Sequence, residues 1–338
     1  MSDVVTESEP AGSPDTGAPG PAAPGGIAVV VNPTKVDDVD ALTATITDRC
    51  EELGLPRPRV LITTAEDPGI GQAKEAVASG ARVVLAAGGD GTVRAVAEAL
   101  VGTGVALGVV PQGTGNLLAR NLDLPIDEAT ALDVALSGAD RTLDVGRLGD
   151  GTVFAVMAGA GFDAAMMRDA PDGLKKAVGW PAYIIGGARS LRRGRVSVRV
   201  RLDEGEWVRE RVRTVLIGNL GKLQGGLDLL PDAEPDDGIL DVALVAPRRA
   251  LDWVVLIGRA LARRNRPDHR MRTFRAKRVQ VRLDRPEPRQ VDGDVVATGD
   301  CLDVDVVPAS LVVRVPREAN RDGAEATDAG DRTDGSDR

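Results

Sequence analysis

A glycine-rich cluster near residue 90 combines the residue types that can hold a phosphate group. It runs Gly88-Gly89-Asp90-Gly91-Thr92 and separates the apolar run "VVLAA" from a stretch with helical periodicity. Glycines let a ligand approach the main chain, and a helix that begins directly after them presents free N–H groups and the positive end of its dipole to an anion. The carboxylate of Asp90 would repel phosphate unless it held a cation or accepted a proton, as in phosphoryl transfer. The cluster therefore predicts a phosphate site with kinase chemistry.

A plain strand-to-helix turn capped by Asp90 would use the same residues. The cluster lacks the GK[ST] ending of one common nucleotide motif, and Val93 with Arg94 breaks the G-x-G-x-x-G spacing of another. A second loop, "PQGTGN" at 111–116, also lies between a predicted strand and a helical stretch. Two such loops at one place favour phosphate binding. Lys35 and Arg94 could offset phosphate charge, or they could be solvated surface residues.

The elements around these loops predict a parallel sheet covered by helices over residues 26–145. Short β-branched runs at 26–31, 59–64, 81–87 and 104–110 alternate with helical patterns at 39–53, at 73–80 and after the glycine cluster. The carboxyl ends of parallel strands share one edge, where ligands bind. Each predicted strand ends in a polar cluster, so the four clusters should converge: 32–35, Thr63 with Thr64, 88–92 and 112–116.

The periodicity changes beyond about residue 146. Residues 195–219 predict two strands joined by a turn at 203–206, and 238–245 and 301–315 also predict strands, with helices near 180–191 and 251–264. We expect residues 146–316 to form a mainly antiparallel β-sandwich domain beside the α/β domain. Whether its last strands return to the first domain stays open at this point.

Composition places the chain among cytoplasmic globular proteins. Residues 1–25 and 317–338 are rich in Pro, Gly, Ser and Asp, so both are expected to be disordered tails. The tails carry net charges of −4 and −3 out of −9, which leaves the body close to neutral and gives no reason to expect nucleic-acid binding. Isolated Cys50 and Cys301 with a single His269 argue against a Cys/His zinc site and a histidine-based triad. The sequence shows neither a signal-peptide pattern nor an apolar run long enough to span a bilayer.

Five segments resemble the diacylglycerol kinase catalytic family, which includes bacterial lipid kinases and sphingosine kinases. They are "VVNPTK", "GGDGTVRAVAEAL", "VPQGTGNLLARNL", "LPDAEPDDGILDV" and "VDGD", in the family's order and approximate spacing over residues 26–315. The resemblance implies an ATP- and magnesium-dependent kinase that phosphorylates a lipid hydroxyl, with diacylglycerol giving phosphatidic acid as the expected reaction. The first domain would hold ATP and the β-rich domain the acyl chains.

The resemblance also implies roles for individual residues. The residues expected to border ATP are Asn32, Pro33, Lys35, Thr63, Thr64, Gly88, Gly89, Asp90, Gly91, Thr92, Gly113, Thr114 and Asn116. A structural magnesium ion would take a carboxylate from Asp237 and backbone carbonyls from Glu234 and Ile239, oxygen ligands that suit a hard cation. An ordinary Asp-Asp-Gly turn is the alternative there. "VDGD" at 291–294 resembles a segment ending D-G-E, which makes Asp294 the expected proton acceptor, with Asp292 beside it and Asp90 as the competing base.

Two positions depart from the family pattern. Leu117 follows Asn116 where many diacylglycerol kinases carry an Asp that would face the substrate head group, an acid that sphingosine kinases also lack. Asp294 stands in place of the family's Glu and is one methylene shorter. The first departure leaves the choice of lipid open, and the second leaves open which carboxylate takes the proton. Two other functions remain as alternatives: an NAD kinase, and a nucleotide-binding regulatory protein without catalytic activity.

The expected partners are the lipid substrate and an anionic membrane surface. The arginine-rich stretches 189–195 and 259–278 could meet lipid head groups, so the protein is expected to work peripherally at the inner face of the membrane. Solvated strand and helix faces are the alternative for both stretches. The oligomeric state stays open, with a homodimer as one arrangement.

Overall fold

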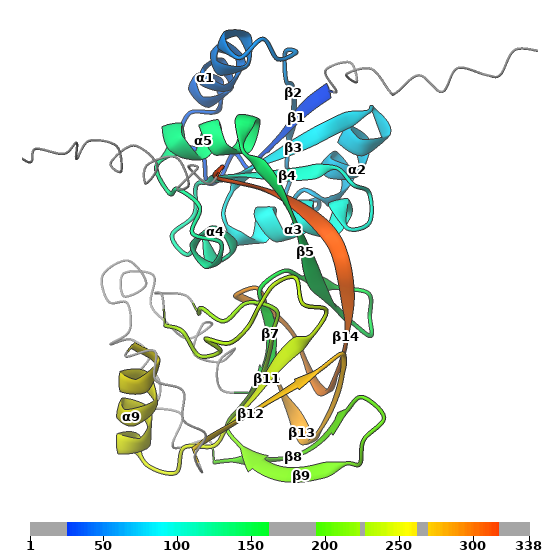
Figure 1. Cartoon of the computed structure of the whole chain (residues 1–338), viewed down its shortest axis with the longest axis vertical. Helices are drawn as coiled ribbons and strands as arrows, with labels where there is room; N and C mark the ends of the chain where they lie inside the picture. The colour runs from blue at the N-terminus through cyan, green and yellow to red at the C-terminus, as the bar shows by residue number, and fades with distance from the viewer. Residues whose placement is uncertain (1–25, 162–193, 224–226, 262–269, 318–338) are drawn as a thin grey trace, which may run out of the picture.

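The computed structural model describes residues 26–161, 194–223, 227–261 and 270–317. Figure 1 shows two lobes, with the N-terminal half of the chain in the upper lobe and the C-terminal half in the lower. The predicted tails, the predicted helix at 180–191 and most of the arginine-rich stretch 189–195 lie outside the described residues. None of the helices within the described ranges has the length and apolar character needed to cross a bilayer.

The upper lobe is the predicted parallel sheet with helices on both faces. Its strands lie in the order β2-β1-β3-β4, and β1 pairs in parallel with both β2 and β3. The elements are β1 (Gly26–Val31), α1 (Val39–Glu52), β2 (Arg59–Ile62), α2 (Ile70–Ala78), β3 (Ala81–Gly88), α3 (Asp90–Leu100), β4 (Ala106–Pro111), α4 (Leu117–Asn121) and α5 (Glu128–Ser137).

Alternate residues of the central strands supply two separate hydrophobic clusters. Val30 and Val84 pack with side chains of α2 and α3 on one face, whereas Val29 and Leu85 pack with α1 and α5 on the other. A strand buried on both faces reads as a continuous apolar run, which is why β1 and β3 could be predicted from the sequence. The sheet therefore holds its carboxyl edge rigidly in place.

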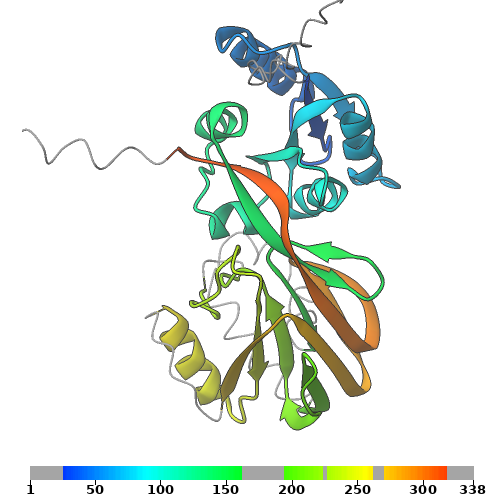
Figure 2. The ribbon, with the colours of Figure 1, turned by 45° about the vertical axis from the view of Figure 1, so that its right-hand side comes forward.

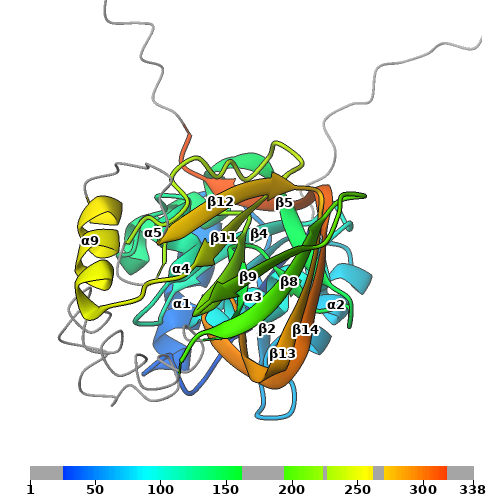
Figure 3. The same ribbon diagram turned by 90° about the horizontal axis from the view of Figure 1, so that it is seen from below.

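The lower lobe is mainly antiparallel, as predicted. Its strands follow the order β12-β11-β10-β7-β13-β14, with β8 and β9 added beside β13. They are β7 (Met157–Gly161), β8 (Val196–Leu202), β9 (Val208–Val212), β10 (Thr214–Gly218), β11 (Leu240–Val245), β12 (Met271–Ala276) and β13 (Arg278–Val291). One helix, α9 (Ala250–Leu261), lies at the outer edge of this lobe in the view from below (Figure 3).

The predicted pair of strands over 195–219 is wrong, because the structure has three strands there. The chain turns at Arg213 from β9, which pairs with β8, into β10, which pairs with β7 and β11. Arg213 is buried, its backbone N–H donates to the Val245 carbonyl at 2.8 Å and its Nε to the Pro247 carbonyl at 2.9 Å. Arg213 is a charged residue at a position where the strand pattern of alternating apolar and polar residues continues. The sequence therefore carries no sign that the chain leaves β8 as its pairing partner and joins β7 and β11.

Two long strands run from one lobe into the other (Figures 1 and 2). They are β5 (Ala139–Leu148), which also pairs with the short β6 (Val153–Phe154), and β14 (Asp294–Val315). The first part of β14 pairs antiparallel with β13, and its end pairs in parallel with β4 at Val312↔Ala106. A single strand thus begins in the lower lobe and finishes in the parallel sheet of the upper lobe.

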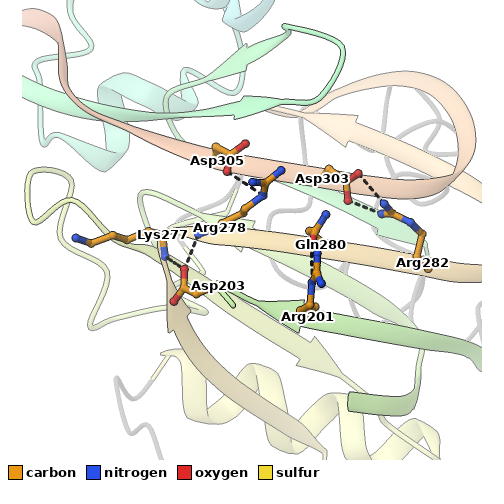
Figure 4. A network of polar contacts seen from close by, with 8 residues as sticks. All are labelled: Arg201, Asp203, Lys277, Arg278, Gln280, Arg282, Asp303 and Asp305. Atoms are coloured by element: carbon orange, nitrogen blue, oxygen red, sulfur yellow. Dashed lines mark hydrogen bonds and ion pairs between the residues drawn. The ribbon is translucent and has the colours of Figure 1, made fainter. Parts of the chain in front are cut away.

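The outer face of the lower lobe carries a network of paired charges (Figure 4). Both guanidinium ends of Arg282 bind the Asp303 carboxylate, and Arg278 Nε lies 3.4 Å from Asp305 Oδ1. Arg201 donates through Nε to Gln280 Oε1 at 2.7 Å. The arginines on this face therefore already have partners from neighbouring strands.

Candidate active site

The loop after β1 is tied to the glycine cluster by Asn32. Asn32 Nδ2 donates to Thr92 Oγ1 at 2.9 Å, and its Oδ1 accepts from the backbone N–H and the hydroxyl of Thr34 at 3.0 and 2.8 Å. Thr92 is buried in the first turn of α3. Asn32 therefore has a fixed orientation and joins the first and third strand ends, as the shared-edge argument predicts.

The two glycine-rich loops touch through their backbones. A Cβ atom on Gly113 would lie 2.9 Å from Gly89 Cα, and the Gln112 N–H donates to the Gly88 carbonyl at 2.9 Å. A Cβ on Gly88 would come within 2.7 Å of Thr92 Cβ. Glycine at 88 and 113 is therefore required by the chain's own packing, a reason that the sequence did not reveal.

Gly89 is different, because the protein itself has room for a side chain there. The atoms nearest to a Cβ at this position are Gly113 Cα at 3.7 Å and Lys35 Cε at 3.8 Å, which are ordinary contacts. Its φ of −86° is open to any residue, and no side chain caps the helix that follows. Neither packing nor backbone geometry explains this glycine, whereas a ligand lying against the main chain would.

Asp90 links the glycine cluster to the second loop. Its Oδ1 accepts from the Leu117 backbone N–H at 2.5 Å, at the start of α4. Burial raises the pKa of Asp90, the Leu117 N–H opposes that shift, and the nearby charge of Asp294 raises it further. Asp90 therefore holds the two loops together. A positive charge nearby would stabilise its ionised form, which burial and the charge of Asp294 disfavour.

Asp294 arrives at the same place from the far end of the sequence. Its Oδ2 lies 3.3 Å from Arg94 Nη2, and a Cβ on Gly91 would lie 3.2 Å from the same oxygen. The Asp294 side chain is 44% exposed, and Arg94 Nε is buried without a hydrogen-bond partner among the described residues. The fold thus sets an accessible carboxylate beside the first turn of α3.

Asp292 has contacts of another kind. It is buried, and its oxygens accept from the backbone N–H groups of Ala155, Val156 and Met157 at 2.9, 2.9 and 2.8 Å. Burial raises the pKa of Asp292 to about 6, while these N–H groups and Arg94 act in the opposite direction. With both oxygens engaged by the main chain, Asp292 fixes the β13–β14 turn, as a positioning residue does, and the catalytic role expected from the sequence stays a prediction.

The other residues expected near ATP lie on the same strand ends. Pro33, Lys35 and Thr114 are exposed, and Asn116 is buried with φ of +46° and accepts through Oδ1 from the Gly113 N–H at 3.1 Å. After β2, Thr63 is buried and its N–H donates to the Val31 carbonyl, whereas Thr64 is exposed. The structure thus keeps the predicted set at the carboxyl ends of the strands.

The expected magnesium loop contains an excess of negative charge. Asp237 Oδ1 accepts from the Ile239 N–H at 2.9 Å, and its Oδ2 forms an ion pair with Arg275. Burial raises the pKa of neighbouring Asp241 to about 6; Arg275 opposes the shift, and the carboxylates of Asp237, Asp232 and Glu234 add to it. Oxygen donors with unbalanced negative charge fit a hard cation, although Arg275 already shares the Asp237 carboxylate.

Within the described ranges, no group of three or more His, Cys, Asp or Glu side chains has the arrangement of a metal site. The predicted site needs one carboxylate with backbone carbonyls, so this finding leaves the assignment of Glu234, Asp237 and Ile239 a prediction.

Two buried polar residues that support the site were missed in the sequence. Asp144 accepts from the Gly238 N–H at 2.5 Å and the Ala309 N–H at 2.7 Å, so it fastens the 235–238 loop to β14. Asn121 accepts from the Lys222 N–H at 2.9 Å and donates to the Leu117 carbonyl at 2.9 Å, which ties α4 to the lower lobe. The available signal for Asp144 was an acid directly between the apolar residues Leu143 and Val145.

Comparison with known proteins identifies both halves of the chain. Residues 26–148 match the family model described as the diacylglycerol kinase catalytic domain, and residues 156–315 match the YegS C-terminal NAD kinase beta sandwich-like domain.

The relatives agree with these family models. A probable lipid kinase YegS-like protein of Pseudomonas aeruginosa is 33% identical over 250 residues, which cover 72% of this chain and 80% of the relative. A diacylglycerol kinase of Mycobacterium tuberculosis is 31% identical over 248 residues, which cover 72% and 79%. The fold is similar to that of a putative diacylglycerol kinase from Bacillus anthracis, with a TM-score of 0.73, 19% identity, and 89% and 97% of the two chains covered. The chain therefore belongs to the diacylglycerol kinase catalytic family, among the YegS-like lipid kinases.

Proposed function

We propose that this protein transfers the γ-phosphoryl group of ATP to the hydroxyl of a lipid, with diacylglycerol as the acceptor. The observation that carries the proposal is the position of Asp294, whose Oδ2 lies beside Gly91 and Arg94 in the first turns of α3. A carboxylate able to accept a hydroxyl proton therefore stands next to a backbone cradle suited to phosphate.

The cradle is formed by the backbones of the two glycine-rich loops. Gly89 leaves space beside its Cα that the chain does not fill, and exposed Lys35 runs along that space and can neutralise phosphate charge. Asn32 and Thr92 hold the neighbouring strand end in place through their hydrogen bond. Positioning and charge neutralisation of this kind supply most of the catalysis in phosphoryl transfer.

Asp294 is the better candidate for the base, and Asp90 for organising the nucleotide. One oxygen of Asp90 is engaged by the Leu117 N–H, whereas the Asp294 side chain is 44% exposed and can meet an incoming acceptor. Asp294 takes the proton as the lipid oxygen bonds to the γ-phosphorus, and the bond from that phosphorus to the ADP oxygen breaks with its electrons leaving on ADP. When bound, magnesium held by Asp90 would neutralise phosphate charge, whereas the 234–239 loop is the proposed site of a separate structural magnesium ion.

A labelled-ATP experiment on a panel of acceptors tests the proposal. Diacylglycerol, sphingosine, ceramide, phosphatidylglycerol, polyprenol and NAD would each be incubated with the full chain and magnesium. Transfer of label to diacylglycerol is expected. Transfer to NAD alone would make the chain an NAD kinase, and tight ATP binding without transfer to any acceptor would make it a regulatory protein; either result contradicts the proposal.

A further inference from the structure

Helix α9 presents an apolar stripe to solvent. Leu251, Val254, Val255 and Gly258 follow one another at the spacing of a single helix face. Leu251 is 72% exposed, Val254 47% and Val255 37%, and a Cβ on Gly258 would meet no atom of the described segments within 4 Å. Contiguous apolar side chains on an exposed helical face are uncommon on a surface that contacts only water. Such patches mark interaction sites.

The opposite face of α9 anchors the helix to the lobe. Leu256 is buried in a cluster with Leu216, Ala243 and Val245, and Trp253 packs against the same cluster. These contacts hold α9 against the lobe with the exposed stripe facing outward. A partner could therefore cover the stripe while α9 stays packed on the sheet.

Positive charge lies at the start of this stripe. Residues 246–275 contain nine arginines against two aspartates; Arg263, Arg264 and Arg266 lie outside the described residues, and Arg270, Arg272 and Arg275 already pair with Asp252, Glu210 and Asp237. Arg248 and Arg249 directly precede α9, both are exposed, and neither has an ion-pair partner within the described part of the chain.

The one acid of the helix is withdrawn from the surface. Asp252 is buried, and Oδ2 accepts from the backbone N–H groups of Arg248 and Arg249 while Oδ1 pairs with Arg270 at 2.8 Å. The carboxylate is thus neutralised behind the stripe. An apolar face with a cationic border is the pattern of a helix that lies in the surface of an anionic bilayer.

We propose that α9 and the two arginines before it dock the protein on an anionic lipid bilayer. The stripe enters the acyl boundary and Arg248 and Arg249 meet head-group phosphates. The proposal rests on the proposed function, because a lipid kinase must reach a substrate held in a membrane. The arginine-rich outer face in Figure 4 is a weaker candidate, since its Arg278 and Arg282 are already paired with aspartates.

Vesicle binding without nucleotide tests this inference separately from catalysis. The full chain would be sedimented with vesicles of phosphatidylglycerol and phosphatidylcholine, and with vesicles of phosphatidylcholine alone. The wild-type chain is expected to bind the anionic vesicles, with binding weakened by salt. Val254→Glu should lower the binding constant at least about tenfold, because it puts a negative charge into the contact. Replacing both Arg248 and Arg249 by Ala should lower it by about thirtyfold.

Val208→Glu is the matched control, because Val208 is 44% exposed and lies on β9, away from α9. It should bind vesicles like the wild-type chain, and all variants should phosphorylate a short-chain diacylglycerol in detergent micelles at the wild-type rate. The docking surface is wrong if the wild-type chain ignores anionic vesicles or if Val254→Glu and Val208→Glu bind equally. A wild-type dimer that Leu251→Glu converts to a monomer would show instead that α9 joins two copies of this chain. A failure of phosphorylation with intact vesicle binding would contradict only the proposed function.

Discussion

Three carboxylates near the glycine cluster differ in burial and in hydrogen-bond partners, although all three are aspartates in the sequence. Asp292 is buried and satisfied by the main chain, Asp90 is half-buried and bridges two loops, and Asp294 is the most accessible. The sequence could place all three near the site through its motifs. The sequence could not distinguish their roles. Whether an aspartate is bound by backbone N–H groups or left open to substrate depends on tertiary contacts, which the residue type does not record.

The distinct role of Asp292 predicts a large loss of stability on substitution. In Asp292→Asn one acceptor oxygen becomes an NH₂ group, so a buried backbone N–H of 155–157 faces another donor, and the free energy of unfolding should fall by about 3 kcal/mol. Asp294→Asn removes one partly exposed ion pair and should cost less than about 1 kcal/mol. Urea unfolding of both variants measures the difference. Equal free energies of unfolding for Asp292→Asn and Asp294→Asn would contradict the positioning role of Asp292.

The raised pKa of Asp90 predicts how nucleotide binding depends on pH. If ionised Asp90 helps to hold magnesium and ATP, affinity should fall on acidification through its pKa, which burial and the charge of Asp294 hold above the ordinary value. Asp294→Asn removes one of those causes, so the acid limb of the affinity profile should move to lower pH. Titration calorimetry across the acidic range measures it. A limb that stays in place or moves to higher pH would show that Asp90 is not the group that titrates.

At the scale of the elements, the site is two glycine loops held in backbone contact at the ends of β3 and β4. Sequence periodicity predicted these strands and the helix after each loop, because strands buried on both faces and an amphipathic helix leave clear patterns. The contact between Gly89 and Gly113 could not be predicted, since nothing local in either loop records how closely the other approaches.

The two loop glycines should therefore respond differently to the same substitution. Gly89→Ala fits the protein, so the chain should keep its melting temperature but lose ATP affinity by at least about tenfold, as the methyl group takes space that phosphate needs. Gly113→Ala places a Cβ 2.9 Å from Gly89 Cα and should lower stability as well. Thermal melts and nucleotide titrations of the pair separate the two effects. Wild-type ATP affinity in Gly89→Ala would contradict the phosphate cradle.

On the scale of the whole molecule, β14 explains how a residue from the last fifth of the chain reaches the glycine-rich loops. The strand starts at Asp294, pairs with β13, and ends in the sheet of the upper lobe beside β4. The sequence predicted an α/β half followed by an antiparallel half, and the fold confirms that class. The extended path of β14 escaped prediction because the pairing of a strand depends on distant partners, whereas its local pattern is the same in either lobe.

The most direct test of the account compares phosphoryl transfer by the wild-type chain, Asp294→Asn and Asp294→Glu. Each would be given labelled ATP, magnesium and diacylglycerol in mixed micelles, at saturating ATP. We expect labelled phosphatidic acid from the wild-type chain and substantial activity from Asp294→Glu, which keeps the carboxylate. Turnover by Asp294→Asn should fall at least about a hundredfold, because the acceptor hydroxyl loses its base. Asp294→Asn turning over diacylglycerol at the wild-type rate would contradict the account and pass the role of base to Asp90.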